Sequence, residues 1–190
     1  MKNRTGILVF VLLESIILSG CGAAGSAKDN SGENVAEYAC IPCGSDCDIM
    51  NYSKPGTCSH CNMELVDSKT IVHKNILPEE MCLLKGKEVI FLDVRTPEEF
   101  NGTAREKFGA IRNAVNIPVQ ELEKRINELE KYKDKEIVVY CSHSHRSPRA
   151  SYMLTQNGFA NVTNMQGGMS VWKERVKEAE CNESLYISQQ

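Results

Sequence analysis

The feature that most constrains the fold of this chain is an alternation of short apolar runs with helical patterns between residues 69 and 177. Five runs have the length of buried strands, at 70–72, 89–94, 114–117, 136–140 and 162–165. Helical patterns separate them, at 78–86, from residue 97 onward, at 119–129 and at 148–157, and a last helix is expected to carry Trp172 and Val176. Strands that alternate with helices build parallel sheets. We therefore expect an α/β domain with a largely parallel, five-stranded sheet and helices on both of its faces.

Local signals define the ends of several of these elements. Thr96 and Glu99 have the spacing of a capping box, with a proline in the first turn of the helix that follows. Gly158 suits the position just after a helix end. In 119–129 the apolar residues share one helical face. These signals predict helices that begin at residue 97 and end at residue 157.

One of the predicted strand ends carries a nucleophile. The strand 136–140 leads into a short polar loop, and a helical pattern begins at about Pro148. Ligands of parallel sheets bind at the carboxyl ends of the strands, where backbone N–H groups and the helix dipole favour an anion. Such surroundings stabilise a thiolate. We predict that Cys141 is a catalytic nucleophile and that the following residues bind its anionic substrate: Ser142, His143, Ser144, His145, Arg146 and Ser147.

Other residues in and near this loop have more than one reading. His143 or His145, if protonated, would stabilise the thiolate. Alternatively, each is an exposed polar residue without a role in catalysis. A third alternative is a metal site formed by Cys141 and both histidines. Asp93 and Arg95 lie at a strand end beside the predicted pocket. We expect them to form a structural ion pair.

The remaining isolated cysteines lie outside the motifs. Cys82 stands among apolar residues and is expected to be a small core residue. Cys181 lies in the polar tail 178–190, where we expect a free thiol or a resolving partner for Cys141. The tail itself has few apolar residues and is expected to be frayed.

Residues 38–66 form a cysteine-rich knuckle with two C-x2-C pairs. Each pair can clamp one side of a tetrahedral ion, and the segment is too short to bury much of a core. Sulfur ligation favours zinc, and cuprous copper is also compatible. The main expected ligands are Cys40, Cys43, Cys58 and Cys61, with Cys47 or His60 as a substitute or fifth contributor. The alternative is a knuckle stapled by disulfides, which an oxidising compartment permits.

The second half of this knuckle resembles a known type of segment. Its Pro-Gly-x-Cys-x-x-Cys-x-Met-x-Leu pattern, residues 55–65, is similar to the heavy-metal-binding segments found beside bacterial metal-efflux proteins. Asn62 stands where that family usually has a glycine, and asparagine tolerates the left-handed backbone that a glycine would supply. The resemblance implies a soft metal as the ligand of the knuckle.

The N-terminus has the features of a bacterial targeting signal. Basic residues precede an apolar run, as in a secretory signal peptide, and the run is short and interrupted by Glu14. Leu18-Ser19-Gly20-Cys21 resembles the lipobox of bacterial lipoproteins, which implies cleavage before Cys21 and lipid on its sulfur. Residues 1–20 are then a signal peptide and 21–37 a flexible tether. The resemblance implies a membrane-anchored, extracytoplasmic protein.

Residues 69–177 resemble a single rhodanese domain, the sulfurtransferase fold. The resemblance lies in Leu92-Asp93-Val94-Arg95 ahead of Glu98-Glu99-Phe100, in residues 109–118, in the Cys141 loop, and in Gly167-Gly168 with Trp172. It implies that Cys141 accepts a sulfane sulfur from a donor such as thiosulfate and passes it to a thiophilic acceptor. Four residues separate Cys141 from Arg146. The corresponding loop of cysteine phosphatases is one residue longer, which fits a tetrahedral phosphate or arsenate.

The sequence thus predicts an extracytoplasmic sulfurtransferase that needs no organic cofactor and carries zinc or another soft metal in its knuckle. Its expected partners are a small sulfur-containing anion, a thiol or protein acceptor, and a membrane. The net charge of −3 indicates no nucleic-acid partner. The alternative is a metal- or sulfur-binding carrier, or redox sensor, with little turnover. A cysteine phosphatase or arsenate reductase is disfavoured by the loop length.

Overall fold

The computed structural model describes residues 37–189. The predicted signal peptide, Cys21 and all but the last residue of the predicted tether lie outside the described residues. Within residues 37–189, no helix combines the length and the apolar character that crossing a membrane requires.

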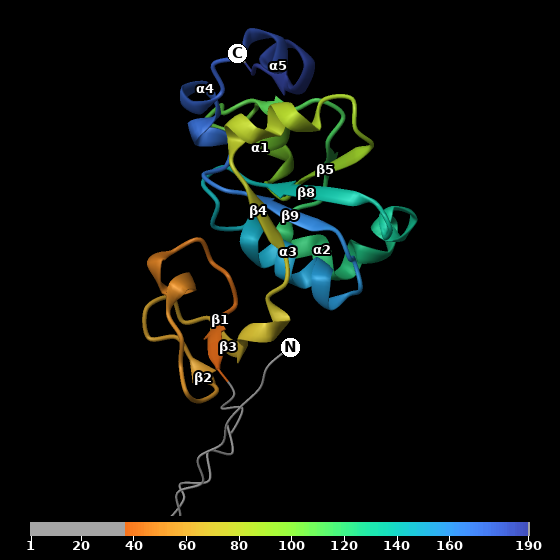
Figure 1. The fold of residues 1–190 in the computed structure, drawn as a ribbon. Helices are drawn as coiled ribbons and strands as arrows, with labels where there is room; N and C mark the ends of the chain where they lie inside the picture. The colour runs from red at the N-terminus through yellow and green to blue at the C-terminus, as the bar shows by residue number, and fades with distance from the viewer. Residues whose placement is uncertain (1–36, 190) are drawn as a thin grey trace, which may run out of the picture. The chain divides into compact units, whose positions relative to one another are not determined.

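A five-stranded sheet with the order β4-β9-β8-β5-β7 forms the centre of the α/β domain (Figure 1). All four of its strand pairings are parallel, which confirms the predicted sheet. Its strands are β4 (Lys74–Ile76), β5 (Val89–Asp93), β7 (Val115–Asn116), β8 (Glu136–Tyr140) and β9 (Val162–Met165). The strand β8 lies in the middle of the sheet, so the residue that follows it emerges at the centre of the carboxyl edge.

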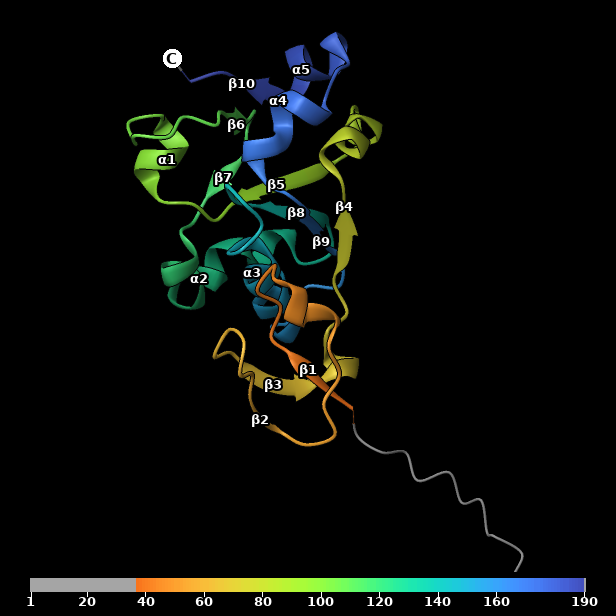
Figure 2. The same cartoon turned by 90° about the vertical axis from the view of Figure 1, so that its left-hand side faces the viewer.

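Alternate residues of the central strands face two separate apolar cores. On β8, Val138 faces one core, while Ile137 and Val139 face the other. One face is covered by α2 (Val119–Arg125), the 3-10 helix η4 (Ile126–Tyr132) and α3 (Ser147–Gln156). The opposite face is covered by η3 (Pro78–Leu84), η5 (Met169–Val171), α4 (Trp172–Arg175) and α5 (Ala179–Leu185), as Figure 2 shows. The prediction of helices on both faces is confirmed.

The structure differs from the prediction at residues 70–72 and 119–129, and the helix predicted over 78–86 is the 3-10 helix η3. Residues 68–70 form a 3-10 turn, η2 (Ser68–Thr70), and the edge strand β4 begins only at Lys74, so the strand predicted at 70–72 is wrong. The reason is local, because the Asp67 side chain accepts a hydrogen bond from the Lys69 N–H, and the Thr70 hydroxyl donates to the Asp67 carbonyl. The helix predicted over 119–129 is divided into α2 and η4.

The predicted capping box at the start of α1 (Pro97–Asn101) is present. Thr96 Oγ1 accepts from the N–H of Glu99 at 3.3 Å, and a carboxylate oxygen of Glu99 accepts from the N–H of Thr96 at 3.1 Å. Gly158, at φ +81°, follows α3 as predicted.

The C-terminal tail is folded as far as Gln189, and the expectations for Cys181 and for a frayed tail are wrong for the described residues. Cys181 is neither free nor paired with Cys141, because it forms a disulfide with Cys82 of η3. Beyond α5, β10 (Tyr186–Ile187) pairs antiparallel with β6 (Ala110–Ile111). Trp172 Nε1 donates to Asn182 Oδ1 at 2.8 Å, and the Trp172 ring stacks on Tyr186. Few apolar residues are needed here, since a covalent link and a polar side-chain contact hold the tail.

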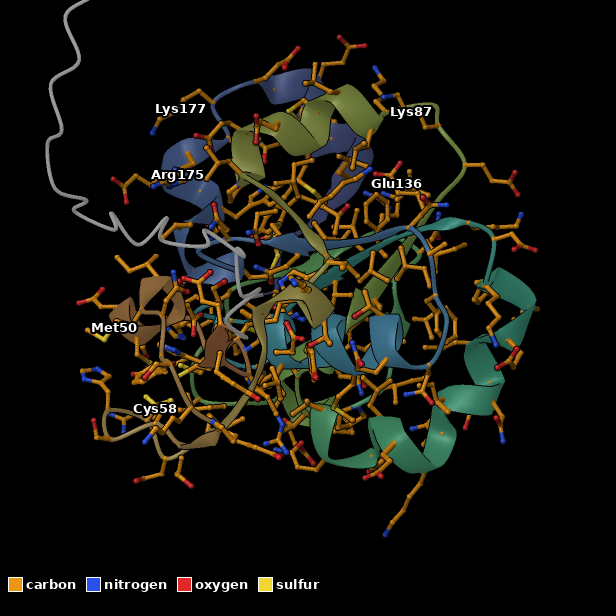
Figure 3. The ribbon with its side chains drawn as sticks, turned by 60° about the horizontal axis from the view of Figure 1, so that its bottom comes forward. Met50, Cys58, Lys87, Glu136, Arg175 and Lys177 are labelled. Atoms are coloured by element: carbon orange, nitrogen blue, oxygen red, sulfur yellow. A yellow bond between two sulfur atoms is a disulfide. The ribbon has the colours of Figure 1, made fainter. Side chains whose placement is uncertain are left out.

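The knuckle is a small antiparallel sheet of order β1-β3-β2, with a 3-10 turn, η1 (Asp46–Ile49), beside it. Its strands are β1 (Tyr38–Cys40), β2 (Gly56–Thr57) and β3 (Glu64–Asp67). In Figure 3, Met50 and Cys58 mark this part of the chain. Asn62 adopts the left-handed conformation that the sequence predicts for it, at φ 59°. The buried cluster at its centre consists of Cys40, Cys47, Cys58 and Leu65.

Candidate active site and cysteine cluster

Cys141 is fully buried directly after β8, at the base of the loop formed by residues 141–147. The carbonyl groups of Cys141 and Ser142 accept hydrogen bonds from the N–H groups of Met169 and Ser170, both at 2.9 Å. A Cβ on Gly168, which has φ +67°, would lie 2.4 Å from the Ser142 carbonyl oxygen. A glycine is therefore required at this close approach, which explains the Gly167-Gly168 pair singled out in the sequence.

The backbone N–H groups of this loop have no hydrogen-bond acceptor in the described part of the protein. Among residues 37–189, the N–H groups of residues 142–147 donate no hydrogen bond. They precede α3, which is ten residues long and begins at Ser147. Ser144 adds local strain because it is a buried non-glycine residue at φ 63°. Unpaired N–H groups at a helix N-terminus are a binding site for an anion.

The Cys141 sulfur has one hydrogen-bonding neighbour within the loop. Its Sγ lies 3.4 Å from Oγ of Ser147, which is also buried. A hydroxyl at this distance can donate to the thiolate and help to stabilise the charged form. Ser142, by contrast, is engaged by Arg146, whose guanidinium donates to its hydroxyl at 2.7 Å.

The positive charge of Arg146 is paired with a carboxylate. Its guanidinium donates to the two carboxylate oxygens of Glu99 at 2.6 and 2.7 Å. These hydrogen bonds lower the pKa of Glu99 to about 2, and Glu99 in turn raises the pKa of Arg146. The charge of the Cys141 thiolate is a further, smaller cause of the raised Arg146 pKa, so the guanidinium also interacts electrostatically with the nucleophile.

Glu99 is a site residue that the sequence did not assign. Its spacing from Thr96 identified it as a helix-capping residue, and it fills that role. The same carboxylate also reaches Arg146, 47 residues further along the chain. Nothing in the local pattern reveals the second contact, because it depends on α1 lying beside the loop in the folded domain.

The two loop histidines point in different directions from Cys141. Both are exposed. The ring of His143 packs edge-on against Phe108, with centroids 5.0 Å apart, and Nδ1 of His145 lies 3.3 Å from the carbonyl oxygen of Cys43 in the knuckle. Among the described residues, no group of converging metal ligands contains Cys141 or either histidine.

Asp93 and Arg95 form a buried, bidentate ion pair. Nη2 of Arg95 lies 2.6 Å from Oδ2 of Asp93, and both side chains are at most 1% exposed. The same Nη2 donates to the Gly109 carbonyl at 2.9 Å. The pair thus joins the end of β5 to the segment before β6, and it touches no loop residue through a hydrogen bond within the described chain.

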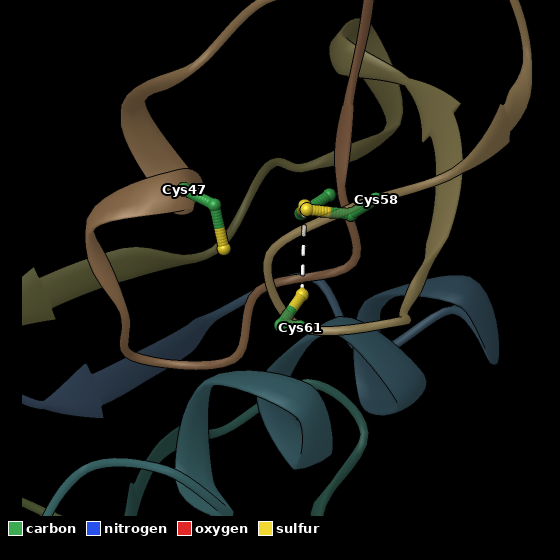
Figure 4. Close-up of side chains that lie close together, drawn as sticks. Cys47, Cys58 and Cys61 are labelled. Atoms are coloured by element: carbon green, nitrogen blue, oxygen red, sulfur yellow. Dashed lines mark hydrogen bonds between the residues drawn. The ribbon is translucent and has the colours of Figure 1, made fainter.

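Four knuckle thiols converge on one point. The sulfur atoms of Cys40, Cys47, Cys58 and Cys61 all lie within 4.8 Å of one another, and Figure 4 shows those of Cys47, Cys58 and Cys61 around a common centre. The Cys40 and Cys61 sulfurs are 3.7 Å apart. The set contains Cys47 in the place where the sequence favoured Cys43. His60 contributes its backbone N–H to the Cys58 sulfur and its ring to no group of converging ligands.

Hydrogen bonds within the cluster stabilise a negative charge on one of its sulfur atoms, which favours binding of a positive ion. Tyr52 Oη and the His60 N–H each lie 3.4 Å from Cys58 Sγ. A hydrogen bond from Cys40, followed by that of Tyr52, lowers the pKa of Cys58 to about 5. Burial raises the pKa of Cys40 to about 12 and raises that of Cys47 as well. A cluster of thiols that includes one preformed thiolate is a site that a soft cation can enter by displacing protons.

The knuckle contacts the Cys141 loop directly. Gly44, at φ +77°, lies so close to Ser144 that an added Cβ would stand 1.9 Å from the Ser144 carbonyl oxygen. Beside this contact is a cleft of about 640 Å³, lined by both regions. Its wall includes Asp48 from the knuckle and His143 and Ser144 from the loop. Two polar atoms of residues lining it, His73 Nδ1 and Asn164 Oδ1, are buried without a hydrogen-bond partner.

The model of the rhodanese-like domain family matches residues 80–175, about half of the chain. The chain belongs to the rhodanese-like domain family. The match includes β5, β8, β9 and the Cys141 loop, so the unpaired loop N–H groups and the buried thiol lie in the rhodanese-like domain. Members of this family handle sulfur donors and acceptors.

Individual proteins are similar to about half of the chain. The uncharacterized protein YqhL of Bacillus subtilis (strain 168) is 37% identical over 101 residues, which cover 53% of this chain and 74% of YqhL. A tRNA uridine(34) hydroxylase of Cronobacter sakazakii is 30% identical over 53% of this chain, but the match spans only 28% of the hydroxylase. A rhodanese-related protein of Thermoplasma volcanium is 34% identical and covers 54% of this chain and 92% of its own, with a TM-score of 0.46.

Proposed function

We propose that the protein is a sulfurtransferase in which Cys141 carries the transferred sulfur. The thiolate attacks the outer sulfur of a donor such as thiosulfate and forms a new S–S bond. The donor's own S–S bond breaks, and sulfite leaves with the electron pair. A thiol or another thiophilic acceptor then takes the outer sulfur and regenerates the Cys141 thiolate.

The observation that carries this proposal is the combination of a buried thiol with unpaired backbone N–H groups above it. Residues 142–147 present these donors at the N-terminus of α3, where a dianionic donor and a persulfide anion are both stabilised. Only four residues separate Cys141 from Arg146, which favours a small sulfur anion over phosphate or arsenate. Because Glu99 pairs with Arg146, we assign the backbone donors the larger share of anion binding.

Mass spectrometry of the intact protein after thiosulfate treatment tests this proposal. We expect the mass to rise by one sulfur atom and to return to its starting value after cyanide is added, with thiocyanate released. Cys141→Ser should gain no sulfur. The control variant replaces Cys82 and Cys181 together with serine, which removes two sulfurs outside the loop and should leave the gain intact. Persulfide formation in Cys141→Ser would refute the assignment.

A second candidate is a carrier that holds one sulfur and releases it only to a specific partner. It is favoured by the contact of the cysteine-rich knuckle with the loop, through Cys43 and His145 and through Gly44 and Ser144. Turnover distinguishes the two functions. A sulfurtransferase releases many sulfite molecules per Cys141 in the presence of cyanide, whereas a carrier stops after one.

We also propose that Cys40, Cys47, Cys58 and Cys61 bind one soft metal ion, with zinc as the expected occupant. Four converging thiols fit the tetrahedral sulfur ligation that zinc prefers, and cuprous copper is the main competitor. Bound metal would supply the folding energy that the small interior of the knuckle lacks. Metal analysis of the purified chain, compared with Cys58→Ser, tests this assignment.

For its location, we propose a membrane-anchored, extracytoplasmic lipoprotein. The support is the sequence Leu18-Ser19-Gly20-Cys21 after a basic and apolar N-terminal segment. Fractionation of bacteria expressing the chain should place it with the membranes, and Cys21→Ala should remove its lipid and move it out of the membrane fraction. An unlipidated Cys21 in the intact chain would overturn the proposal.

A further inference from the structure

Cys43 is the knuckle cysteine outside the four-thiol cluster, and its thiol has close neighbours of its own. Its Sγ lies 3.6 Å from Sγ of Cys47 and 3.3 Å from Oδ1 of Asp48. The ligand atoms of these three residues all lie within 4.8 Å of one another. Cys47 is therefore a member of two groups of converging ligands.

The spacing of this second group is that of ligands on one ion. Two sulfurs bound to a tetrahedral zinc at about 2.3 Å lie about 3.8 Å apart, and a sulfur and a carboxylate oxygen about 3.5 Å apart. The pairs that include Cys43 are at 3.6 and 3.3 Å, and Cys40 and Cys61 of the four-thiol cluster are at 3.7 Å. Both groups thus have comparable spacing for metal binding.

The backbone also holds the carboxylate of Asp48 in place. The N–H of Cys43 donates to Oδ1 at 3.0 Å, and the N–H of Gly44 donates to Oδ2 at 2.7 Å. The Cys43 N–H also lies 3.1 Å from Oδ2. These bonds orient the carboxylate toward the Cys43 thiol, and Oδ1, the oxygen nearest to that thiol, retains a lone pair for a metal once the thiol has lost its proton. The 3-10 turn η1 supplies Cys47 and Asp48 as adjacent residues.

We propose that the knuckle holds two metal ions that share the thiolate of Cys47. One lies among Cys40, Cys47, Cys58 and Cys61, and the other is bound by Cys43, Cys47 and Asp48. The inference rests on the proposed four-thiolate site and adds a second, bridged ion to it. Binding the second ion displaces one proton, from the Cys43 thiol, and its two positive charges are balanced by the Cys43 thiolate and the Asp48 carboxylate.

The two sites have different access to solvent. Cys40, Cys47 and Cys58 are buried, whereas Cys43 and Asp48 are half-buried. Three protein ligands leave one tetrahedral position open, which is the arrangement of an ion that takes an external ligand. Asp48 lines the cleft that also contains His143 and Ser144. The second ion is therefore an exchangeable, divalent thiophilic cation beside the Cys141 loop.

Titration of the metal-free, full-length chain with Zn²⁺ under anaerobic conditions, followed by native mass spectrometry, tests this inference. Cys141→Ser serves as the parent chain, so that the loop thiol does not bind metal, and the Cys82–Cys181 disulfide is kept. We expect two Zn²⁺ per chain in the parent and one after Cys43→Ser or Asp48→Asn is added. Asp46→Asn, an exposed acid outside the group, is the matched control and should retain two.

Cobalt titration tests the shared sulfur itself. The electron paramagnetic resonance signal of high-spin Co²⁺ should rise up to one equivalent and fall toward two, because a bridging thiolate couples the two ions magnetically. Without a bridging thiolate, the signal should continue to rise up to two equivalents. That result would refute the proposal that Cys47 binds both ions.

The possible results separate the two metal proposals. Saturation of the parent at one Zn²⁺ would overturn the second site and leave the four-thiolate site standing. Absence of any bound metal would overturn both. Two Zn²⁺ in Cys43→Ser would place the second ion elsewhere and refute the proposed ligands. One retained Zn²⁺ in Cys43→Ser or Asp48→Asn also shows that the variant knuckle is folded.

Discussion

The knuckle and the rhodanese-like domain differ in what fills their interiors. Among the described residues, the domain has two apolar clusters of twelve buried residues each, one on either face of the sheet. The buried cluster of the knuckle has four residues, three of which are cysteines. So small an interior does not offset the conformational entropy that folding removes. The comparison teaches that one region is organised by apolar burial and the other by its thiols.

The largest expected effect is loss of the knuckle when its metal is removed. Structural zinc supplies roughly 10–16 kcal/mol of apparent folding free energy in small zinc domains. Chelation, or Cys58→Ser, should therefore abolish hydrogen-exchange protection over residues 38–67 while β5 and β8 stay protected. Ser59→Ala changes an exposed neighbour and is the control. A knuckle that stays protected without metal would contradict the comparison.

A smaller, complementary effect is expected from the core of the domain. Leu154 on α3 is fully buried, and Leu154→Ala should lower the free energy of unfolding by about 2–5 kcal/mol. Denaturant unfolding should give the same loss with and without chelator, because this core does not depend on metal. Arg149→Ala, on an exposed position of the same helix, should cost far less. A loss that depends on the chelator would show that the two interiors are not independent.

In the domain, Cys82 and Cys181 form a covalent cross-link, whereas the knuckle cysteines are free thiols. The disulfide links residues 99 positions apart and fastens α5 to η3. Replacing both cysteines with serine should lower stability by about 2–4 kcal/mol. Metal content should stay unchanged. Calorimetry and metal analysis of the same sample measure both quantities, and a loss of metal would contradict the separation of roles.

The smallest expected effect is a pH dependence of the Glu99–Arg146 pair. The pKa of Glu99 is lowered to about 2, so its contribution to stability is complete above the ordinary glutamate pKa of about 4.5 and is lost as the pH falls toward 2. Stability relative to Glu99→Gln should differ by about 2 kcal/mol at pH 6, and the difference should vanish near pH 2. Urea unfolding across this range measures it. A constant difference would show that the charge of Glu99 is not the cause.

Patterns of neighbouring residues predicted much of the domain. The parallel sheet, the capping box at Thr96 and the strand–loop–helix unit around Cys141 all follow from local periodicity and end signals. The contacts that the sequence did not reveal join distant residues. Cys181 meets Cys82, and Glu99 meets Arg146, only because the chain returns to the same place. The C-x2-C spacing favoured Cys43 as a cluster ligand, but the turn η1 carries Cys47 into that cluster.

The close approach of Gly44 to Ser144 has a consequence for engineering this protein. Gly44 packs against the backbone carbonyl group of Ser144, in the loop that follows the nucleophile. A side chain at position 44 would collide with this carbonyl group. A domain transplanted as residues 69–177 alone would leave that surface bare and the strained Ser144 unsupported. The two regions should therefore be moved together, with position 44 kept as glycine, whenever the catalytic loop is to be grafted into another protein.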